Sequence, residues 1–373
     1  MSSHPTSKMD CAGLLPLRQF FFLPLAAKAL AMRVLCLFSL LLLHLPLRAA
    51  EWFPLEVQID GRSASYRPLM QSSKPWRICA LLPHGMDRYW WGVAWGLHEE
   101  ARRQGVQLGV YEAGGYQYPD MQRAQLTRCI QLAADAYVVA AINTQGLCDE
   151  IALLHRDGVP VIDLVNRIDC PGISARSQVD FADMAKAALT YIQHHSGGRA
   201  VRVGWLPGPQ DAGWVADAER GLQAALKGGS VTLVSGGYGP VDRSTQAVLV
   251  RQLLAREPEL DYILGNAEAA AFAAQLVRSG GSRYRAQVVS LYATERILES
   301  IGDGGILAAP TDSPVIQARV AIDLAVRALE GKQSPARVSP LIEVIDQANL
   351  KRFDFGRLMP PSGHWMIRQE LPE

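Results

Sequence analysis

Aromatic side chains recur just after short apolar segments of the sequence. Tyr89 and Trp90 follow one such segment in PHGMDRYWW, Tyr116 follows another in EAGGY, and Tyr292 closes the segment VVSLY. The face of an aromatic ring attracts a methylated ammonium group by about 0.5–2 kcal/mol, depending on desolvation. We therefore expect these four rings to form a cage for an organic cation.

Polar residues stand at comparable positions. Asp312 follows LAAPT and would supply a counter-charge, and Asn166 in LVNRID would donate a hydrogen bond to an oxygen of the ligand. Asp87, Trp214 and Asn266 are further candidates, since each also follows an apolar segment. Asp87 is equally suited to cap the next helix, and Trp214 could be an exposed residue at the rim of a cleft.

Other conspicuous residues have structural interpretations. Arg167 and Asp169 could pair with each other or face solvent, and His84 is weak evidence for a site by itself. Trp91 and Trp95 are four residues apart, a spacing that favours packing in the core.

The sequence contains no signature of an enzyme. It lacks a GxSxG elbow, a GxxxxGK[ST] phosphate loop and an HExxH motif. His194 and His195 lie at the end of an expected helix with no obvious nucleophile nearby. Nothing in the chain requires catalysis or a cofactor.

Four cysteines follow the N-terminal leader described below: Cys79, Cys129, Cys148 and Cys170. They form no CxxC motif or His/Cys cluster, so we expect no metal site. In an exported protein they allow up to two disulfides, in three possible pairings, and buried free thiols are an equal alternative.

The elements that must position these residues alternate regularly from residue 76 onward. Strands are expected at 76–83, 106–114, 136–142, 159–165, 201–208, 231–237, 261–266, 286–292 and 305–310, with helices between them and a long helix at 314–330. Fully apolar strands separated by helices indicate parallel sheets that are covered on both faces.

These strands are too many for one ordinary sheet, and they fall into two series with a break between Ser174 and Met184. We expect an α/β fold with two Rossmann-like doubly wound lobes and a ligand cleft between them. Ligands of such sheets bind beyond the carboxyl ends of the strands, where the rings stand. We expect the chain to be organised as an N-terminal hairpin at 51–75 around Asp60-Gly61, an N-terminal lobe at 76–178 and 293–335, a C-terminal lobe at 179–292 and 336–350, and an extended, mobile tail at 351–373.

The charge distribution points to export. Residues 1–50 carry five Lys or Arg against one Asp, a net of +4, so the remainder of a chain of net charge +1 carries 1 − 4 = −3. A mildly acidic body without a basic stripe argues against nucleic-acid binding. Residues 32–50 have the basic, apolar and small-residue regions of a signal peptide, and 1–31 are an over-extended start or part of a long leader. An uncleaved membrane anchor is the alternative.

Residues 76 to about 345, through WRICALLP, DRYWWGVAWGLHEEARRQGV, LVNRID, ILGN and GILAAPTDSP, resemble periplasmic binding proteins of the ribose-binding type. This resemblance implies two lobes joined by three crossings, with Tyr89 and Trp90 where sugar binders stack rings on the sugar. Sugar binders usually have an Asp-Arg pair where this chain has Asn166-Arg167, and an Asp where it has Tyr292. The loss of two carboxylates argues against a sugar ligand.

A closer resemblance is to the members of this family that sense trimethylamine N-oxide. It rests on Tyr89-Trp90 after an Asp, EAGGY, LVNxID, LPGPxxAG and VVSxY, and extends over nearly all of the chain from Met32. It implies a non-enzymatic periplasmic sensor that binds trimethylamine N-oxide and signals to a membrane sensor histidine kinase, inducing trimethylamine N-oxide respiration. Contact with the membrane would then be only through this partner. The alternative is the substrate-binding component of an ABC transporter for a sugar or small amine.

Overall fold

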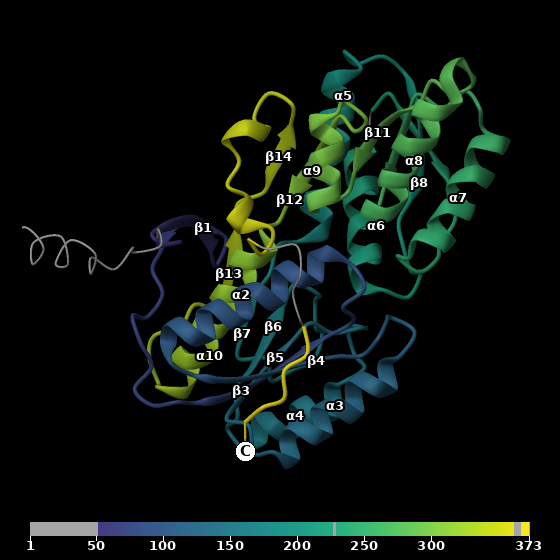
Figure 1. The fold of residues 1–373 in the computed structure, drawn as a ribbon. Coiled ribbons are helices and arrows are strands. Elements are labelled where there is room, and N and C mark those ends of the chain that lie inside the picture. The colour runs from purple at the N-terminus through teal and green to yellow at the C-terminus, as the bar shows by residue number, and fades with distance from the viewer. Residues whose placement is uncertain (1–50, 227–228, 362–366, 373) are drawn as a thin grey trace, which may run out of the picture. The chain divides into compact units, whose positions relative to one another are not determined.

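The apolar strands assemble into two separate sheets in the computed structural model, which describes residues 51–226, 229–361 and 367–372 (Figure 1). The strands of the first sheet, in spatial order, are β2 (Arg62–Tyr66), β1 (Leu55–Ile59), β13 (Arg337–Pro340), β7 (Ala175–Ser177), β6 (Val161–Leu164), β5 (Ala136–Val139), β3 (Arg77–Leu82) and β4 (Gln107–Glu112). Those of the second are β14 (Glu343–Asp346), β12 (Ala308–Thr311), β11 (Gln287–Ser290), β10 (Tyr262–Gly265), β8 (Val201–Leu206) and β9 (Val231–Ser235). We call the sheets and their helices the first and second lobe.

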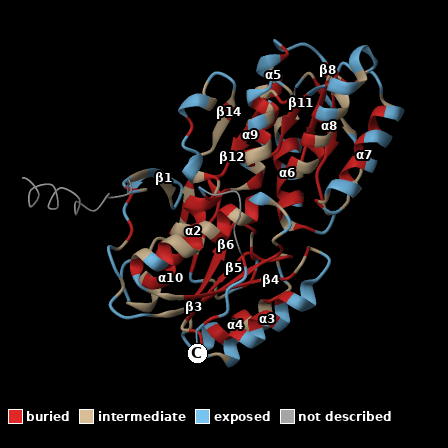
Figure 2. Ribbon diagram, in the orientation of Figure 1, coloured by how far each residue is buried: buried red, intermediate tan, exposed pale blue. Residues whose placement is uncertain are grey.

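Helices cover both faces of each sheet, as the apolar strands predict. In the first lobe, α2 (Arg88–Gln104) and α10 (Pro314–Leu329) pack together on one face, and α3 (Pro119–Gln131) and α4 (Cys148–Arg156) lie on the other. In the second lobe, α5 (Phe181–His195) and α6 (Gly213–Leu226) pair, opposite α7 (Arg243–Arg256), α8 (Ala267–Gly280) and α9 (Glu295–Gly302). Strands β5 and β6 are buried at every residue (Figure 2). The expected α/β class with two doubly wound lobes is confirmed.

Helices α2 and α10 approach each other closely because α2 carries glycines on the shared face. A Cβ atom at Gly96 would lie 2.3 Å from the backbone oxygen of Val315. This close contact fixes the start of α2, which carries part of the candidate site, relative to the start of α10.

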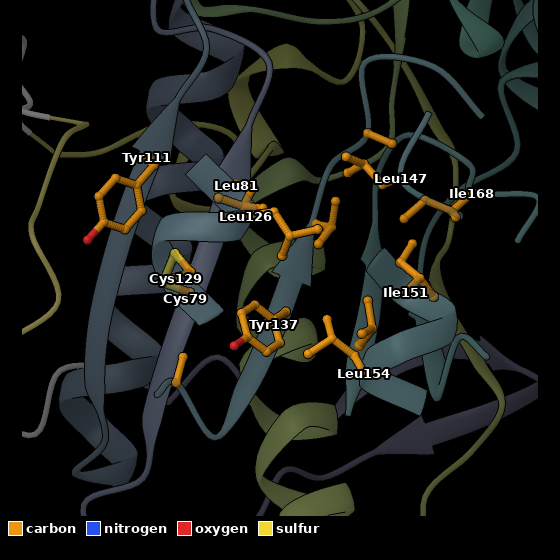
Figure 3. Packing of buried hydrophobic residues seen from close by; sticks show 14 of the residues in the cluster. Cys79, Leu81, Tyr111, Leu126, Cys129, Tyr137, Leu147, Ile151, Leu154 and Ile168 are labelled. Carbon is orange, nitrogen blue, oxygen red and sulfur yellow. A yellow bond between two sulfur atoms is a disulfide. The ribbon is translucent and has the colours of Figure 1, made fainter. Parts of the chain in front are cut away.

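Both possible disulfides form, and both lie in the first lobe. Cys79 on β3 pairs with Cys129 on α3, and Cys148 on α4 pairs with Cys170 in the loop after β6. The first bond runs through the apolar cluster between the sheet and α3 and α4 (Figure 3). The structure thus selects one of the three pairings that the sequence left open.

The predicted N-terminal hairpin is confirmed, and it extends the first sheet. Asp60 and Gly61 have positive φ angles of 49° and 79° and turn β1 into β2. Strand β1 pairs antiparallel with β13, so residues 55–66 belong to the first lobe.

The expected lobe boundaries near the C-terminus need correction. Strand β12 pairs with β11 and β14, so residues 293–311 remain in the second lobe and the chain leaves it only before α10. Conversely, β13 pairs with β7 in the first lobe, although residues 336–350 were assigned to the second. The two lobes share the same alternation of strands and helices, and short strands do not indicate which sheet they join.

The tail is not extended throughout, because it begins with two 3-10 turns, η2 (Leu350–Arg352) and η3 (Phe355–Arg357), and its last described residues are held in place. Gln369 and Val110 on β4 exchange two backbone hydrogen bonds of 2.7 and 3.0 Å, and Leu371 is buried beside Gly109. This contact covers the outer edge of β4, the last strand of the first sheet. The prediction of a mobile tail is therefore wrong for residues 367–372.

The expected signal peptide and over-extended start, residues 1–50, lie outside the described residues. Within the ranges that the structure describes, no helix has the length and apolar character needed to cross a membrane.

Candidate ligand-binding site

A narrow cavity lies where the carboxyl ends of the strands of both lobes meet. Its walls are formed by His84, Asp87, Tyr89, Trp90, Tyr116, Val165, Asn166, Phe181, Trp214, Val241 and Tyr292. The space that the centre of a water-sized sphere can reach is about 20 Å³, slightly more than the roughly 10–15 Å³ that one water needs, so a larger ligand requires the rings or the lobes to move apart. Seven of these residues were among the nine candidates from the sequence.

Aromatic rings surround this cavity in a closed circuit. Neighbouring ring centroids are 5.4–6.5 Å apart, and the ring planes meet at 60–90°. The members in order are His84, Trp90, Tyr89, Tyr292, Trp214 and Tyr116, which contacts His84 again. Edge-to-face contacts are the favourable geometry for such pairs. The first four expected rings therefore lie together, and His84 and Trp214 complete the cage.

The start of α2 places two of the rings. The carboxylate of Asp87 caps the helix by accepting a hydrogen bond of 3.2 Å from the backbone N–H of Trp90. The same half-buried carboxylate lines the cavity, and burial raises its pKa, while nearby His84 and the helix N–H groups lower it. Both interpretations of Asp87, as a cap and as a cavity residue, therefore hold.

Asp312 lies behind the ring of Tyr89 and does not line the cavity. Its Oδ2 accepts hydrogen bonds from the Tyr89 hydroxyl (2.5 Å) and from the side-chain amide of Gln317 (2.6 Å). Its Oδ1 is buried and has no hydrogen-bond partner among the described residues, and burial raises the pKa of the carboxyl. The expectation that Asp312 faces the ligand as counter-charge is thus wrong in position, because the strand end places it on the far side of Tyr89. It orients Tyr89, and Asp87 is the carboxylate at the cavity wall.

Asn166 lines the cavity, but its donors are already engaged. Its amide nitrogen donates to the backbone oxygen of Ala141 (2.8 Å) and to the hydroxyl of Tyr116 (3.0 Å). Val165, just before it, has a φ of 60°, a strained conformation for a β-branched residue. Asn166 therefore holds Tyr116 in place and is not free to donate to a ligand, contrary to expectation. The O–H of Tyr116 remains available as a donor.

Trp214 contributes the clearest unused hydrogen-bond donor. The residue is only 5% exposed, which rules out the interpretation as an exposed rim residue, and it contacts Tyr116, Tyr292 and Phe181 through its ring. Its indole N–H is buried and close enough to the Tyr116 hydroxyl to lower the pKa of that group, but no acceptor among the described residues meets hydrogen-bond geometry. A buried donor without an acceptor costs about 1–3 kcal/mol, which a ligand oxygen would recover.

Three conspicuous residues lie outside the cavity. Asn266 caps α8 through the backbone N–H of Ala269 (3.1 Å) and donates to the backbone oxygen of Leu206 (3.2 Å). The structure does not bring it to the cavity, so it is a structural cap. Trp91 and Trp95 are half-buried on the surface of α2 instead of in the core.

Sequence reasoning missed four lining residues. His84 is the second residue after β3, a signal that could have been given more weight, whereas Val165, Phe181 and Val241 are apolar residues without any signal. The Nδ1 atom of His84 accepts a hydrogen bond of 3.3 Å from the backbone N–H of Met86, and burial lowers the pKa of the ring. Burial therefore favours the uncharged form of this ring of the cage.

The comparisons with known proteins agree with this geometry. Residues 79–333 match the model of the periplasmic binding protein domain family. The chain belongs to the periplasmic binding proteins, the class that two such lobes and a cavity between them define. Within this class it is TorT-like: it is 33% identical to the periplasmic protein TorT of Escherichia coli K12 over 298 residues, which cover 79% of this chain and 84% of that protein. The resemblance found in the sequence is confirmed.

Two solved structures are particularly informative. One is an ABC transporter solute-binding protein from Bradyrhizobium sp. BTAi1 with bound Bis-Tris, with 38% identity, a TM-score of 0.75, and coverage of 85% of this chain and 98% of that one. The other is TorT in complex with the TorS sensor domain in the presence of trimethylamine N-oxide, with 26% identity, a TM-score of 0.70, and coverage of 78% and 98%.

Proposed function

We propose that this protein is a periplasmic, non-enzymatic sensor that binds trimethylamine N-oxide in the ring cavity and signals to the periplasmic domain of a TorS-like sensor kinase, inducing trimethylamine N-oxide respiration. The observation that carries the proposal is the closed circuit of six rings with one carboxylate, Asp87, and an unused buried donor, the N–H of Trp214.

The ligand matches this combination group by group. Trimethylamine N-oxide has three methyl groups on a positively charged nitrogen and one negatively charged oxygen. Ring faces attract the methylated nitrogen, and Asp87 adds negative charge at the wall. The oxygen needs donors, which the Trp214 N–H and the Tyr116 O–H provide. A sugar would need many more polar groups than this cavity offers.

The relatives support the partner and the location. TorT has been crystallised with the TorS sensor domain, with and without trimethylamine N-oxide, and the curated relatives are named as periplasmic proteins. A ligand shifts a conformational equilibrium only by its differential affinity for the two states. We therefore expect the ligand to favour closed lobes and the sensor to recognise the closed form.

Isothermal titration of residues 51–373 with trimethylamine N-oxide, alone and with the sensor's periplasmic domain, tests the proposal. Binding should be strengthened by the sensor domain and lost in Trp90→Ala. Trp95→Ala is the matched control, because it removes a half-buried tryptophan of the same helix outside the cavity. Trimethylamine, which lacks the oxygen, should bind far more weakly. Absence of heat with trimethylamine N-oxide in either mixture, or equal binding by the two tryptophan variants, would overturn the assignment.

A second candidate is a solute-binding component of an ABC transporter for a small amine. The 38% identity to a transporter protein with bound Bis-Tris favours it, because Bis-Tris is itself a tertiary amine. Titration with Bis-Tris, in a buffer free of amines, compares the two ligands directly. Neighbouring genes for a permease and an ATPase would indicate transport, whereas a hybrid kinase and a molybdenum reductase would indicate sensing.

A further inference from the structure

An ion pair between Arg167 and Asp217 joins the two lobes directly beside the cavity, and a second pair, between Arg88 on α2 and Glu295 on α9, also joins them. The guanidinium of Arg167, in the first-lobe loop after β6, donates two parallel hydrogen bonds of 3.1 Å to the carboxylate of Asp217 on α6 of the second lobe. Asp217 is 4% exposed. Bidentate pairs of this kind are among the strongest and most directional contacts between charged side chains.

The remaining nitrogen of Arg167 is also engaged, so the guanidinium has none to offer a ligand. Its Nη1 donates to Asp169 of the same loop. The guanidinium contacts the other lobe, and Arg167 does not line the ring cavity.

The two partners of this pair also adjoin the two rings that meet across the lobes. Asn166, the neighbour of Arg167, holds the hydroxyl of Tyr116. Trp214 is three residues before Asp217 on α6, and residues with this spacing share one face of a helix. The hollow beside Arg167 and Asp217 shares Val165, Phe181 and Trp214 with the ring cavity. The pair therefore fixes the position of Trp214 opposite Tyr116.

We propose that Arg167 and Asp217 are positioning residues that form a latch: their contact favours closed lobes before any ligand binds and aligns Trp214 with Tyr116 for binding. The alignment of Trp214 with Tyr116 for ligand binding rests on the proposed function. The preference for closed lobes rests only on the contact between the lobes.

The surrounding charges make the latch reversible. Asp217 also accepts a hydrogen bond of 2.5 Å from Arg220 of the same helix, and Arg220 reaches Asp180 at 3.3 Å. When the lobes separate, Asp217 keeps Arg220 and Arg167 keeps Asp169. Since neither lobe is left with an unpaired buried charge, opening does not carry the full penalty of breaking a buried ion pair.

Small-angle X-ray scattering of the protein without ligand tests the latch separately from the identity of the ligand. Arg167→Met keeps the length of the side chain but removes both hydrogen bonds, so it should increase the radius of gyration. Asp217→Asn should do the same, and Arg167→Lys, which keeps the charge but not the bidentate contact, should lie between. Arg202→Met is the matched control, because Arg202 pairs with Glu257 within the second lobe at 2.6 Å.

Affinity provides the second measurement. If the closed form is the one that binds, the apparent dissociation constant for trimethylamine N-oxide rises in proportion to the loss of that form. We expect a rise of about tenfold in Arg167→Met and no change in Arg202→Met. Circular dichroism confirms that each variant is folded, and if Arg167→Met is not, Arg167→Lys replaces it.

The same radius of gyration in wild type, Arg167→Met and Arg202→Met would overturn the latch. If trimethylamine N-oxide does not bind the wild type at all, the proposed function fails, but the scattering experiment still decides on the latch.

Discussion

The two lobes contribute differently to the cavity. The first lobe provides four rings, and each has a defined support: Asn166 holds Tyr116, Asp312 at the end of β12 holds Tyr89, the cap at Asp87 sets the helix that carries Trp90, and the backbone N–H of Met86 donates to His84. The second lobe provides Trp214 and Tyr292 to the circuit: the backbone N–H of Ala267 bonds to Tyr292, whereas the N–H of Trp214 has no acceptor with hydrogen-bond geometry among the described residues. The first lobe is therefore the preorganised half of the site, and the second is the half that a ligand completes.

The covalent structure has the same asymmetry. Both disulfides lie in the first lobe, and the second lobe contains no cysteine. The bond between Cys148 and Cys170 ties α4 to the loop that carries the strained Val165, Asn166 and Arg167. A strained conformation persists only where its surroundings hold it, and this disulfide is part of that support.

The largest expected effect concerns this difference in rigidity. Replacing both Cys79 and Cys129 by alanine opens a loop of 50 residues and should lower the free energy of unfolding by about 4 kcal/mol in the chain-entropy model. Replacing Cys148 and Cys170, which close 22 residues, should lower it by about 3 kcal/mol. Urea unfolding followed by circular dichroism measures both values.

Ligand titration of the same two variants sharpens the comparison. Where the protein is folded, only the second pair should weaken the binding of trimethylamine N-oxide, since it supports Asn166 and Arg167. Equal affinities in both variants would show that the loop does not need its disulfide.

The next effect tests the half of the site that the ligand completes. Trp214→Phe keeps an aromatic ring but removes the unused N–H, and should weaken binding of trimethylamine N-oxide by about 2 kcal/mol, since hydrogen bonds to charged groups contribute about 1.5–3 kcal/mol. This corresponds to roughly thirtyfold in the dissociation constant by titration calorimetry. Trp205→Phe is the control, because Trp205 is a buried tryptophan of the second lobe whose N–H reaches Glu219 at 3.3 Å, outside the cavity. Similar affinities for the two variants would remove the assigned role of the N–H.

The third effect separates the two functions of Asp87. Asp87→Asn keeps a good helix cap but removes the charge, so binding at neutral pH should weaken by on the order of 1 kcal/mol. Because burial raises the pKa of Asp87, the affinity of the wild type should fall as the pH is lowered through that raised value. The N-oxide oxygen also takes up protons in acid, so the quantity to compare is the difference between wild type and Asp87→Asn, which should vanish at low pH.

The pH dependence of stability gives an independent test of the direction in which the pKa of Asp87 is shifted. A carboxyl whose pKa is raised in the folded state contributes stability below its unfolded pKa and loses it as the pH rises through the folded pKa. Without ligand, Asp87→Asn should therefore be as stable as wild type or more stable at neutral pH, and this advantage should disappear in acid. A profile with the opposite slope would mean that the Asp87 charge is stabilised in the folded protein.

Much of this arrangement follows from the sequence. The alternation of apolar strands and helices predicts two doubly wound sheets, and the rule that ligands bind beyond the strand ends selects Tyr89, Trp90, Tyr116 and Tyr292. All four line the cavity. The rule works because the sequence shows which residues follow a strand. In a parallel sheet the carboxyl ends of all strands lie at the same edge, so these residues come together there.

The rest depends on distances that the sequence does not contain. A position after a strand does not indicate on which side of a neighbouring ring a side chain lies. For this reason Asp312 was the expected counter-charge in the cavity, and Asp87 was only a further candidate. Likewise, Asn166 follows a strand, but only the folded structure shows that Ala141 and Tyr116 take both of its N–H groups. The contact of Arg167 with Asp217 joins residues 50 positions apart in different lobes, and no local pattern predicts it.

The smallest effect compares one donor from each lobe. Tyr116→Phe removes the hydroxyl that Asn166 orients but keeps the ring, and should weaken binding by about 0.7 kcal/mol, in the lower part of the range for a neutral hydrogen bond, or roughly threefold. If Tyr116 and Trp214 donate to the same ligand oxygen, the double variant should lose less affinity than the two single losses combined, because each donor acts on a charge that the other has already partly neutralised. Strict additivity in this titration would show that the two donors act independently and not on one shared oxygen. A larger loss for Tyr116→Phe than for Trp214→Phe would reverse the comparison and make the preorganised lobe the one that recognises the oxygen.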